Sequence, residues 1–300
     1  MSPITEKLSS LDNIISDYDV FVFDLWGVVH DGENLFNDTV AFIKHLHQIK
    51  KHIVFLSNSS KDSNYIKTFL SSMGMDVKDS YKIMSSGEFF RYQVQHDPNF
   101  SKEKKFFDLG NNFRNFQKLS MNFVDSISSD VDYVIISIVL KDLSELNPWQ
   151  GQLEVAAANK IPALCINPDL RAPHGKGPLL YTPGYFADIY KNIGGNVTYF
   201  GKPHSSIYEF TLSEYIKEKS IPKNRIIAVG DALRTDIKGA NDFGIRSLLV
   251  LREGLHRDML NQDISSIRQV CAEYDIYPNY VIDEMTYTST NTNVGCDNQL

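Results

Sequence analysis

Short apolar runs alternate along this chain with segments that have the spacing of helices. The runs 20–24 (VFVFD), 52–58 (HIVFLSN) and 225–231 (RIIAVGD) are rich in β-branched and aromatic residues, as buried strands are. Strands that alternate with helices build parallel sheets, because the crossover between parallel strands has room for a helix. We therefore expect an α/β fold, a doubly wound parallel sheet with helices on both faces. Further strands are predicted over 81–87, 131–139, 161–167, 197–202, 246–251 and 279–283.

Helices are predicted where apolar residues recur three and four positions apart. In the segment 39–50, the side chains of Val40, Ile43, Leu46 and Ile49 fall on one side of a helix. Asn37 or Asp38 is a suitable N-cap. Similar spacing predicts helices over 64–73, 149–160, 205–219 and 235–243.

The composition narrows the classes of function. A chain of 300 residues can form one large core, or a core with a smaller second domain. Its net charge of −7 does not favour a nucleic-acid partner, and no segment has the length to span a membrane. Cys165, Cys271 and Cys296 lack the spacing of a zinc site or a disulfide framework. Acids interrupt the N-terminal segment, so it is not a secretory signal and we expect a soluble cytoplasmic protein. The periodicity does not decide for or against a homo-oligomer.

Polar residues follow four of the predicted strands. In an open parallel sheet, ligands bind outside the carboxyl ends of the strands, along one edge of the sheet. This edge would bring together a carboxylate, a hydroxyl with an amide, a lysine and a pair of carboxylates. The residues are Asp24, Ser57, Asn58, Lys202, Asp231 and Asp236.

Each of these groups has a use in phosphoryl transfer. An aspartate can attack phosphorus and form an aspartyl-phosphate. Carboxylates and a backbone carbonyl suit Mg²⁺, which reduces the repulsion between an anionic nucleophile and a phosphate. A hydroxyl, N–H groups and a lysine can hold the phosphoryl oxygens. Each residue alone also has a plainer interpretation, because an aspartate after a strand is usually a turn or a helix cap. The ordered set of four strand ends is much more specific than any member.

Four segments that contain these residues resemble the motifs of the haloacid dehalogenase-like (HAD) hydrolase superfamily. They are FDLWG, FLSNSS, GKP and GDALRTD, in this order along the chain. The extended run GVVHDG and the segment CINPD (165–169) make the sequence most similar to the class IIA branch, which contains phosphatases of nucleotides, sugar phosphates and aryl phosphates. The similarity extends over roughly residues 18–285.

The resemblance implies a domain organisation. It implies a Rossmann-like HAD core formed by residues 1–85 and 179–285, and an α/β cap of the C2 type formed by residues 86–178. In this branch the cap covers the active site and helps to select the leaving group. The polar tail 286–300 lacks periodicity, and we expect it to be poorly ordered.

The resemblance also implies a role for each residue. Asp24 would be the nucleophile and Lys202 would neutralise charge, while Ser57 and Asn58 would bind phosphate. Asp231 would bind Mg²⁺ together with Asp24 and the backbone carbonyl of Trp26. Asp236 would be a ligand or would hold the ligands in place. The substrate would be a small phosphomonoester.

Trp26 is the departure from the family pattern. Phosphatases of the superfamily usually have a second aspartate there, which protonates the leaving oxygen and later activates water. Tryptophan keeps the backbone carbonyl but lacks this acid, whose help is typically worth about 10²–10⁴-fold. Substrates with good leaving groups would need it least. His30 or Asp31 could stand in for it, although a loop histidine is more often solvated or structural.

Two further interpretations stay open. A protein without the second aspartate could bind a phosphorylated ligand and turn it over poorly or not at all. Dehalogenase chemistry would also dispense with that acid, but it gives no reason for two acids in GDALRTD. The loop 169–180, with Arg171, His174 and Lys176, could be a cap hinge that touches substrate anions or a solvated basic loop.

Overall fold

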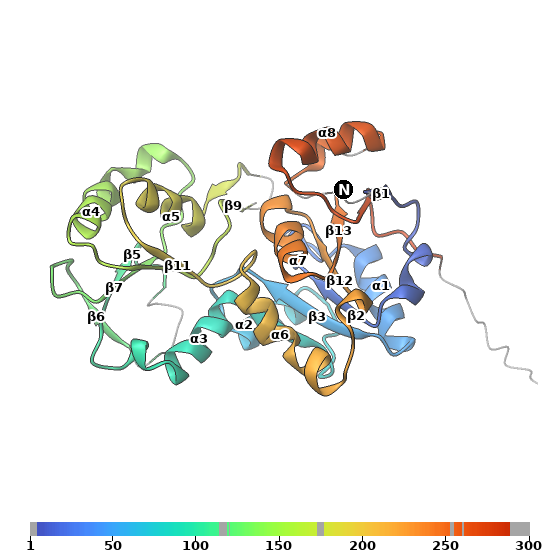
Figure 1. Cartoon of the computed structure of the whole chain (residues 1–300), viewed down its shortest axis with the longest axis horizontal. Helices are drawn as coiled ribbons and strands as arrows, with labels where there is room; N and C mark the ends of the chain where they lie inside the picture. Colours follow the sequence, from blue (N-terminus) through green and yellow to red (C-terminus); the bar gives the residue numbers. More distant parts are fainter. Residues whose placement is uncertain are drawn as a thin grey trace, which may run out of the picture.

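Two parallel sheets form separate parts of the molecule (Figure 1). The computed structural model describes residues 5–113, 119, 121–172, 177–252, 255–259 and 261–288. The larger sheet has seven strands, and all of its neighbouring strands run parallel. In spatial order they are β1 (Glu6–Lys7), β14 (Tyr280–Ile282), β13 (Arg246–Val250), β12 (Ile226–Gly230), β2 (Val20–Phe23), β3 (His52–Ser57) and β4 (Lys82–Ser85). The predicted doubly wound α/β fold is confirmed.

The smaller sheet comes from the middle of the chain, drawn in green to olive on the left of Figure 1. Its five strands are also parallel. In order they are β11 (Val197–Tyr199), β8 (Ala163–Cys165), β7 (Tyr133–Ile136), β5 (Lys105–Leu109) and β6 (Asn122–Val124). A short antiparallel pair, β9 (Arg171–Ala172) and β10 (Leu180–Tyr181), lies between the two parts.

Eight α-helices connect the strands of the described residues. They are α1 (Asn37–Gln48), α2 (Ser63–Ser72), α3 (Ser86–His96), α4 (Asn147–Ala158), α5 (Pro183–Asn192), α6 (Ser205–Ser213), α7 (Lys238–Phe243) and α8 (Ile264–Tyr274). The helices expected over 205–219 and 235–243 are each interrupted, because residues Glu214–Glu218 and Leu233–Ile237 adopt π-helical turns. No helix among these residues is long and apolar enough to cross a membrane.

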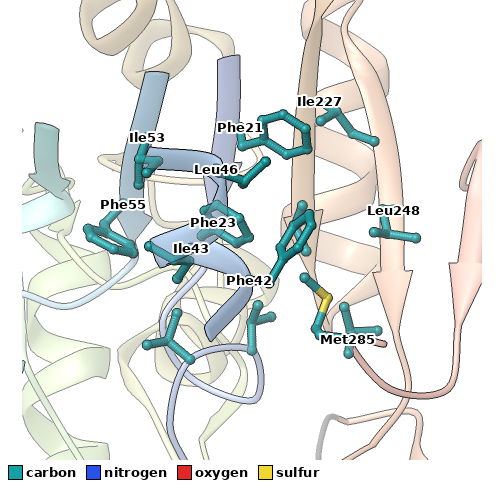
Figure 2. Packing of buried hydrophobic residues seen from close by; sticks show 14 of the residues in the cluster. Phe21, Phe23, Phe42, Ile43, Leu46, Ile53, Phe55, Ile227, Leu248 and Met285 are labelled. Atoms are coloured by element: carbon teal, nitrogen blue, oxygen red, sulfur yellow. The ribbon is translucent and has the colours of Figure 1, made fainter. Parts of the chain in front are cut away.

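Alternation along β2 explains why helices cover both faces of the large sheet. Phe21 and Phe23 point into a cluster with Phe42 and Leu46 of α1, which Figure 2 shows from close by. Val20 and Val22 point to the opposite face, into a cluster that contains side chains of α3, α6 and α7. Burying one such large side chain contributes roughly 1.5–3 kcal/mol. The fully buried run VFVF therefore fixes the strand that carries Asp24 at its end.

The same second cluster continues into the small sheet. Phe90 of α3 packs edge-to-face on Phe100, Phe113 and Phe200, and Phe106 of β5 belongs to the same cluster. The other face of the small sheet packs on α4 and α5 through a separate apolar cluster. Helix α3 therefore joins the two parts by apolar contacts as well as by the chain.

The expected domain boundaries need two changes. The strand predicted at 197–202 was expected in the core, but β11 pairs with β8 of the small sheet, and α5 packs on that sheet. We therefore propose that the inserted domain ends near residue 200 rather than at 178. The tail expected from residue 286 begins later, because Thr286 Oγ1 donates to Ser9 O at 3.0 Å and Thr288 N donates to Asp12 Oδ2 at 2.7 Å. Residues 289–300 lie outside the described part.

Candidate active site

Lys202 joins two of the predicted carboxylates. Its Nζ lies 2.6 Å from Asp24 Oδ1 and 2.7 Å from Asp236 Oδ1, and the lysine is only 3% exposed. Asp24 is fixed by its own position after β2, where its N–H donates to the carbonyl of Val229 in β12 at 2.8 Å. Three segments that are far apart in the sequence thus meet. Asp24 and Asp236 follow the adjacent strands β2 and β12, as predicted, whereas Lys202 follows β11 of the small sheet rather than a strand of the large one.

Asp231 completes a group of three buried carboxylates. Oxygen atoms of Asp24, Asp231 and Asp236 lie within 4.8 Å of one another. Leu255 N donates to Asp231 Oδ2 at 3.1 Å, and Ala232 N donates to Asp236 Oδ2 at 3.1 Å. Both oxygens of Asp236 are therefore occupied. In contrast, Asp24 Oδ2 and Asp231 Oδ1 accept no hydrogen bond from the described residues.

Two glycines let the chain pass close to these carboxylates. Gly27 follows Trp26 with φ +76°, and a Cβ there would lie 2.5 Å from Asp231 Oδ2. At Gly230 a Cβ would lie 2.2 Å from the Cβ of Asp236. Any other residue would push the loops apart. The glycines of LWG and VGD are thus part of how the site closes around the carboxylates.

The buried charges of the site favour the binding of a cation. Burial raises the pKa of Asp24 to about 7, against the opposing effect of Lys202. Burial, with Asp24 and Asp236 nearby, raises the pKa of Asp231 well above its ordinary value. Burial opposes the charge on Lys202, but Asp236 and Asp24 more than compensate and raise its pKa. Three carboxylates with one ammonium leave a negative charge that a divalent cation would balance.

The donor set fits Mg²⁺. Asp24 Oδ2 and Asp231 Oδ1 are hard oxygen ligands with no competing donor among the described residues. The Trp26 carbonyl accepts no backbone hydrogen bond from these residues either, and the glycine after it brings this loop against Asp231. Asp236 would hold Lys202 rather than bind the metal directly.

Asn58 lies at the site, but its side chain holds the loops together. Its Oδ1 accepts from Lys202 N at 2.7 Å, while its Nδ2 donates to Lys202 O at 3.0 Å and to Asp169 Oδ1 at 2.8 Å. Gly201, with φ +131°, permits this approach because a Cβ there would lie 2.6 Å from Asn58 Oδ1. Ser57 is 9% exposed at the end of β3, where its Oγ accepts from Ser59 N at 3.2 Å. Phosphate binding by Ser57 and Asn58 stays a prediction.

The two expected substitutes for the missing acid are occupied elsewhere. His30 is 4% exposed, its Nδ1 accepts from Gly32 N at 3.0 Å, and its ring lies between Trp26 and Phe69. Burial lowers the pKa of His30 to about 4, so the ring is neutral at neutral pH. Asp31 Oδ1 accepts from the N–H groups of the next turn. His30 and Asp31 therefore have structural roles.

A small cavity of about 50 Å³ lies over the carboxylates. Its walls include Trp26, Asp169 and Arg171 in addition to the predicted charged residues. A larger cavity of about 850 Å³ shares Asp169, Arg171, Thr235 and Leu255 with it and extends between α5 and α8. Of the predicted hinge cations, Arg171 lines both cavities, and its guanidinium stacks on Tyr181 and donates to Leu179 O at 3.2 Å. His174 and Lys176 lie outside the described residues.

Sequence reasoning missed two residues of this site. Asp169 contributed to the family resemblance, yet it had no role assigned, although its place just after the strand 163–165 was a usable signal. Leu255, whose N–H holds Asp231, gives no signal in the sequence because its contribution is a backbone group.

Two family models match the chain at its two ends. The haloacid dehalogenase-like hydrolase model matches residues 21–115, and the HAD-hydrolase-like model matches residues 199–285. These matches include both segments that supply the buried carboxylates. The chain belongs to the HAD-like hydrolases, and its inserted second sheet agrees with the class IIA resemblance.

Particular relatives resemble the chain over most of its length. Phosphoglycolate phosphatases 1A and 1B of Arabidopsis thaliana, described as chloroplastic, are each 23% identical over 274 residues, which is 82% of this chain and 72% of theirs. A haloacid dehalogenase-like hydrolase from Brucella suis has a TM-score of 0.71 at 26% identity, covering 83% of this chain and 94% of its own. A structure from Cytophaga hutchinsonii, described as a possible sugar phosphatase of the HAD superfamily, has a TM-score of 0.76 at 21% identity, covering 94% and 99%.

Proposed function

We propose that the protein is a Mg²⁺-dependent phosphatase that hydrolyses a small phosphomonoester through an aspartyl-phosphate at Asp24. The observation that carries this proposal is the buried contact of Lys202 with both Asp24 and Asp236, beside Asp231. An aspartate that served only as a turn residue would not need a buried ammonium. The relatives named phosphoglycolate phosphatases support the choice of a phosphomonoester.

Each residue has a task in this proposal. Asp24 is positioned by β2 and β12, so that Oδ1 lies beside Lys202 and would attack phosphorus, while Oδ2 would bind the metal. Lys202 binds phosphoryl oxygens and is held in place by Asp236 and by the side chain of Asn58. Ser57 and backbone N–H groups after β3 would bind the remaining oxygens. Mg²⁺, held by Asp24, Asp231 and the Trp26 carbonyl, would supply charge neutralisation when bound.

The shape of the site restricts the substrate. The small cavity accommodates only a group of about phosphate size, whereas the larger cavity next to it can hold the rest of a substrate. Arg171 and Thr235 line both cavities, so they lie where the two halves of a substrate would join. The leaving group would therefore lie between α5 and α8.

A second candidate function is a phosphate-ligand-binding relative without turnover. Trp26 favours it, because this residue cannot supply the acid that the family usually has there. Both candidates predict phosphate binding, and turnover separates them.

The test is phosphate release from p-nitrophenyl phosphate, sugar phosphates, nucleotides and 2-phosphoglycolate, with Mg²⁺ or with EDTA. Asp24→Asn is the matched blank, because it keeps the size of the side chain and removes the nucleophile. We expect turnover that requires both the metal and Asp24, with at least about 10³-fold loss in the blank. Equal turnover in EDTA would contradict the metal site. Ligand-induced stabilisation without turnover above the blank would favour the binding protein instead.

A further inference from the structure

Asp169 is the one carboxylate in the small cavity that the proposed function leaves without a task. Four aspartates line this cavity, and three of them form the cluster around Lys202. Asp169 comes from the segment after β8 that connects the small sheet to β9. It lines the small cavity together with Asp24, the proposed nucleophile.

The backbone of Asp169 is held firmly in position. Its carbonyl accepts from Thr182 Oγ1 and from Gly184 N at 3.1 Å, and its own N–H donates to Asn167 Oδ1 at 3.1 Å. A Cβ at Gly184 would lie 2.5 Å from this carbonyl, so the start of α5 packs directly on the segment. A group that acts on a reacting atom must be held in position, and these contacts hold Asp169.

The side chain of Asp169 has one fixed and one free oxygen. Asn58 Nδ2 donates to Oδ1 at 2.8 Å, whereas Oδ2 accepts no hydrogen bond from the described residues. Burial raises the pKa of Asp169 to about 6, with Lys202 and Asn58 opposing this change and Asp236 adding to it. A carboxyl group of this kind can hold a proton near neutral pH and can also give it up.

Asp169 lies at the junction of the two cavities, since it lines both. With the phosphoryl group in the small cavity and the leaving group in the large one, the bridging oxygen must lie at this junction. That oxygen is the atom that needs a proton when its bond to phosphorus breaks.

We propose that Asp169 is the general acid and base of this site, in place of the aspartate that Trp26 replaces. The proposal rests on the proposed phosphatase function. An oxygen of Asp24 attacks phosphorus and the bond to the bridging oxygen breaks. The electron pair stays on that oxygen, which takes the proton of Asp169 and leaves as an alcohol. Asp169, now a carboxylate, takes a proton from water as the water oxygen attacks the aspartyl-phosphate. The bond from Asp24 to phosphorus then breaks, and inorganic phosphate leaves.

The experiment compares phenyl phosphate with p-nitrophenyl phosphate in Asp169→Asn. The two substrates have similar shapes, but phenolate is the poorer leaving group and depends more on protonation. Asparagine can still accept the hydrogen bond from Asn58, so the fold and the position of Lys202 should persist. We expect kcat/KM for phenyl phosphate to fall about 10²–10⁴-fold, and that for p-nitrophenyl phosphate to fall less than about tenfold. An equal loss on both substrates, or no loss on phenyl phosphate, would overturn the proposal.

The matched control is Asp142→Asn. Asp142 is exposed and lines neither cavity, so its replacement should leave both kcat/KM values unchanged. Wild-type hydrolysis of p-nitrophenyl phosphate that persists in Asp24→Asn would contradict the proposed function itself, and Asp169 would fall with it. Asp24-dependent hydrolysis with an unchanged ratio in Asp169→Asn would contradict only the role of Asp169.

A second variant restores a carboxyl group at position 26, which also lines the small cavity. Trp26→Asp in the Asp169→Asn background should recover at least about tenfold of the phenyl phosphate activity, because it returns the carboxyl group that the family usually has there. The same substitution in the wild-type background should give a smaller gain. Equal gains in both backgrounds would contradict Asp169 as the acid.

Discussion

Asp24 and Asp108 lie at the carboxyl ends of two similar strands in the two parts of the molecule. Both come after an apolar, aromatic run, VFVFD in the large sheet and KFFDL in the small one, and both lie near or at the carboxyl end of a buried parallel strand. Asp24 contacts Lys202 and belongs to the carboxylate cluster. Asp108 instead accepts from Ser137 Oγ and from Phe113 N at 2.9 Å.

The difference comes from the neighbouring strands rather than from the aspartate. Beside β2, strand β12 delivers Asp231 and Asp236, and Lys202 arrives from the segment after β11. Beside β5, strand β7 delivers Ser137, a neutral donor. The same local pattern therefore gives a cluster of carboxylates around Lys202 in one sheet and a turn held by Ser137 and Phe113 in the other. An aspartate after a strand indicates catalysis only where other strand ends supply a cation and further carboxylates.

The largest effect should come from Lys202→Met, which removes the cation from the charged centre. Asp24 and Asp236 would then lose the cation that contacts both of them, so we expect a loss of roughly 3–5 kcal/mol in the free energy of unfolding of the metal-free protein. Activity should fall by at least about 10²-fold, because the phosphoryl oxygens lose a charged donor. Denaturant unfolding and phosphate release measure the two effects.

The matched control for this variant is Lys104→Met in the small sheet. Lys104 pairs with Asp132 at 2.8 Å on the surface, where solvent screens the charges. We expect no measurable change in activity or stability. A loss of activity and stability as large as that of Lys202→Met would mean that this surface lysine matters as much as the buried one, and would contradict the comparison.

A smaller effect should follow from adding or removing Mg²⁺. The pKa of Asp24 is about 7 in the folded protein, and an aspartate in the unfolded chain has a pKa of about 3.9. Between these two pH values the folded state holds a proton that the unfolded state lacks. The free energy of unfolding of the metal-free protein therefore decreases as the pH rises towards 7. Mg²⁺ replaces the proton, and its stabilising effect should therefore be larger at about pH 8 than at about pH 6.

Thermal unfolding with Mg²⁺ and with EDTA at the two pH values measures this effect, with about 2.7 kcal/mol expected at a hundredfold excess over Kd. Asp231→Asn should abolish the difference in thermal stability between Mg²⁺ and EDTA. Hydrogen exchange should show added protection after β2 and β12, and none after β5 and β7. Equal stabilisation at both pH values would contradict metal binding by the raised carboxylates.

The sequence predicted the charged centre better than the neutral residues around it. Asp24, Asp231 and Asp236 could be found because they follow apolar strands that pair in one sheet, whereas Lys202 follows a strand of the other sheet. The hydrogen bond from Leu255 N to Asp231 could not be found, since any residue carries a backbone N–H. These residues show that strand periodicity locates side chains at strand ends but not the loops that hold them.

The limits of the strand prediction were topological. The run 197–202 has a strand pattern, and the family resemblance implied that it belongs to the core domain, residues 179–285. In the structure it pairs with β8 as a short, partly exposed edge strand of the small sheet, and its pattern does not specify the partner. Apolar pattern decides whether a strand forms, whereas pairing depends on contacts distant in the sequence.

The central claim is that Asp24, and not Asp108, is the nucleophile. The most direct measurement is mass spectrometry of the protein quenched with acid during turnover of p-nitrophenyl phosphate with Mg²⁺. We predict one added phosphoryl group on the peptide that contains Asp24, its absence in Asp24→Asn, and its presence in Asp108→Asn. Turnover without a phosphorylated Asp24 peptide, or with the phosphoryl group retained in Asp24→Asn, would contradict the account.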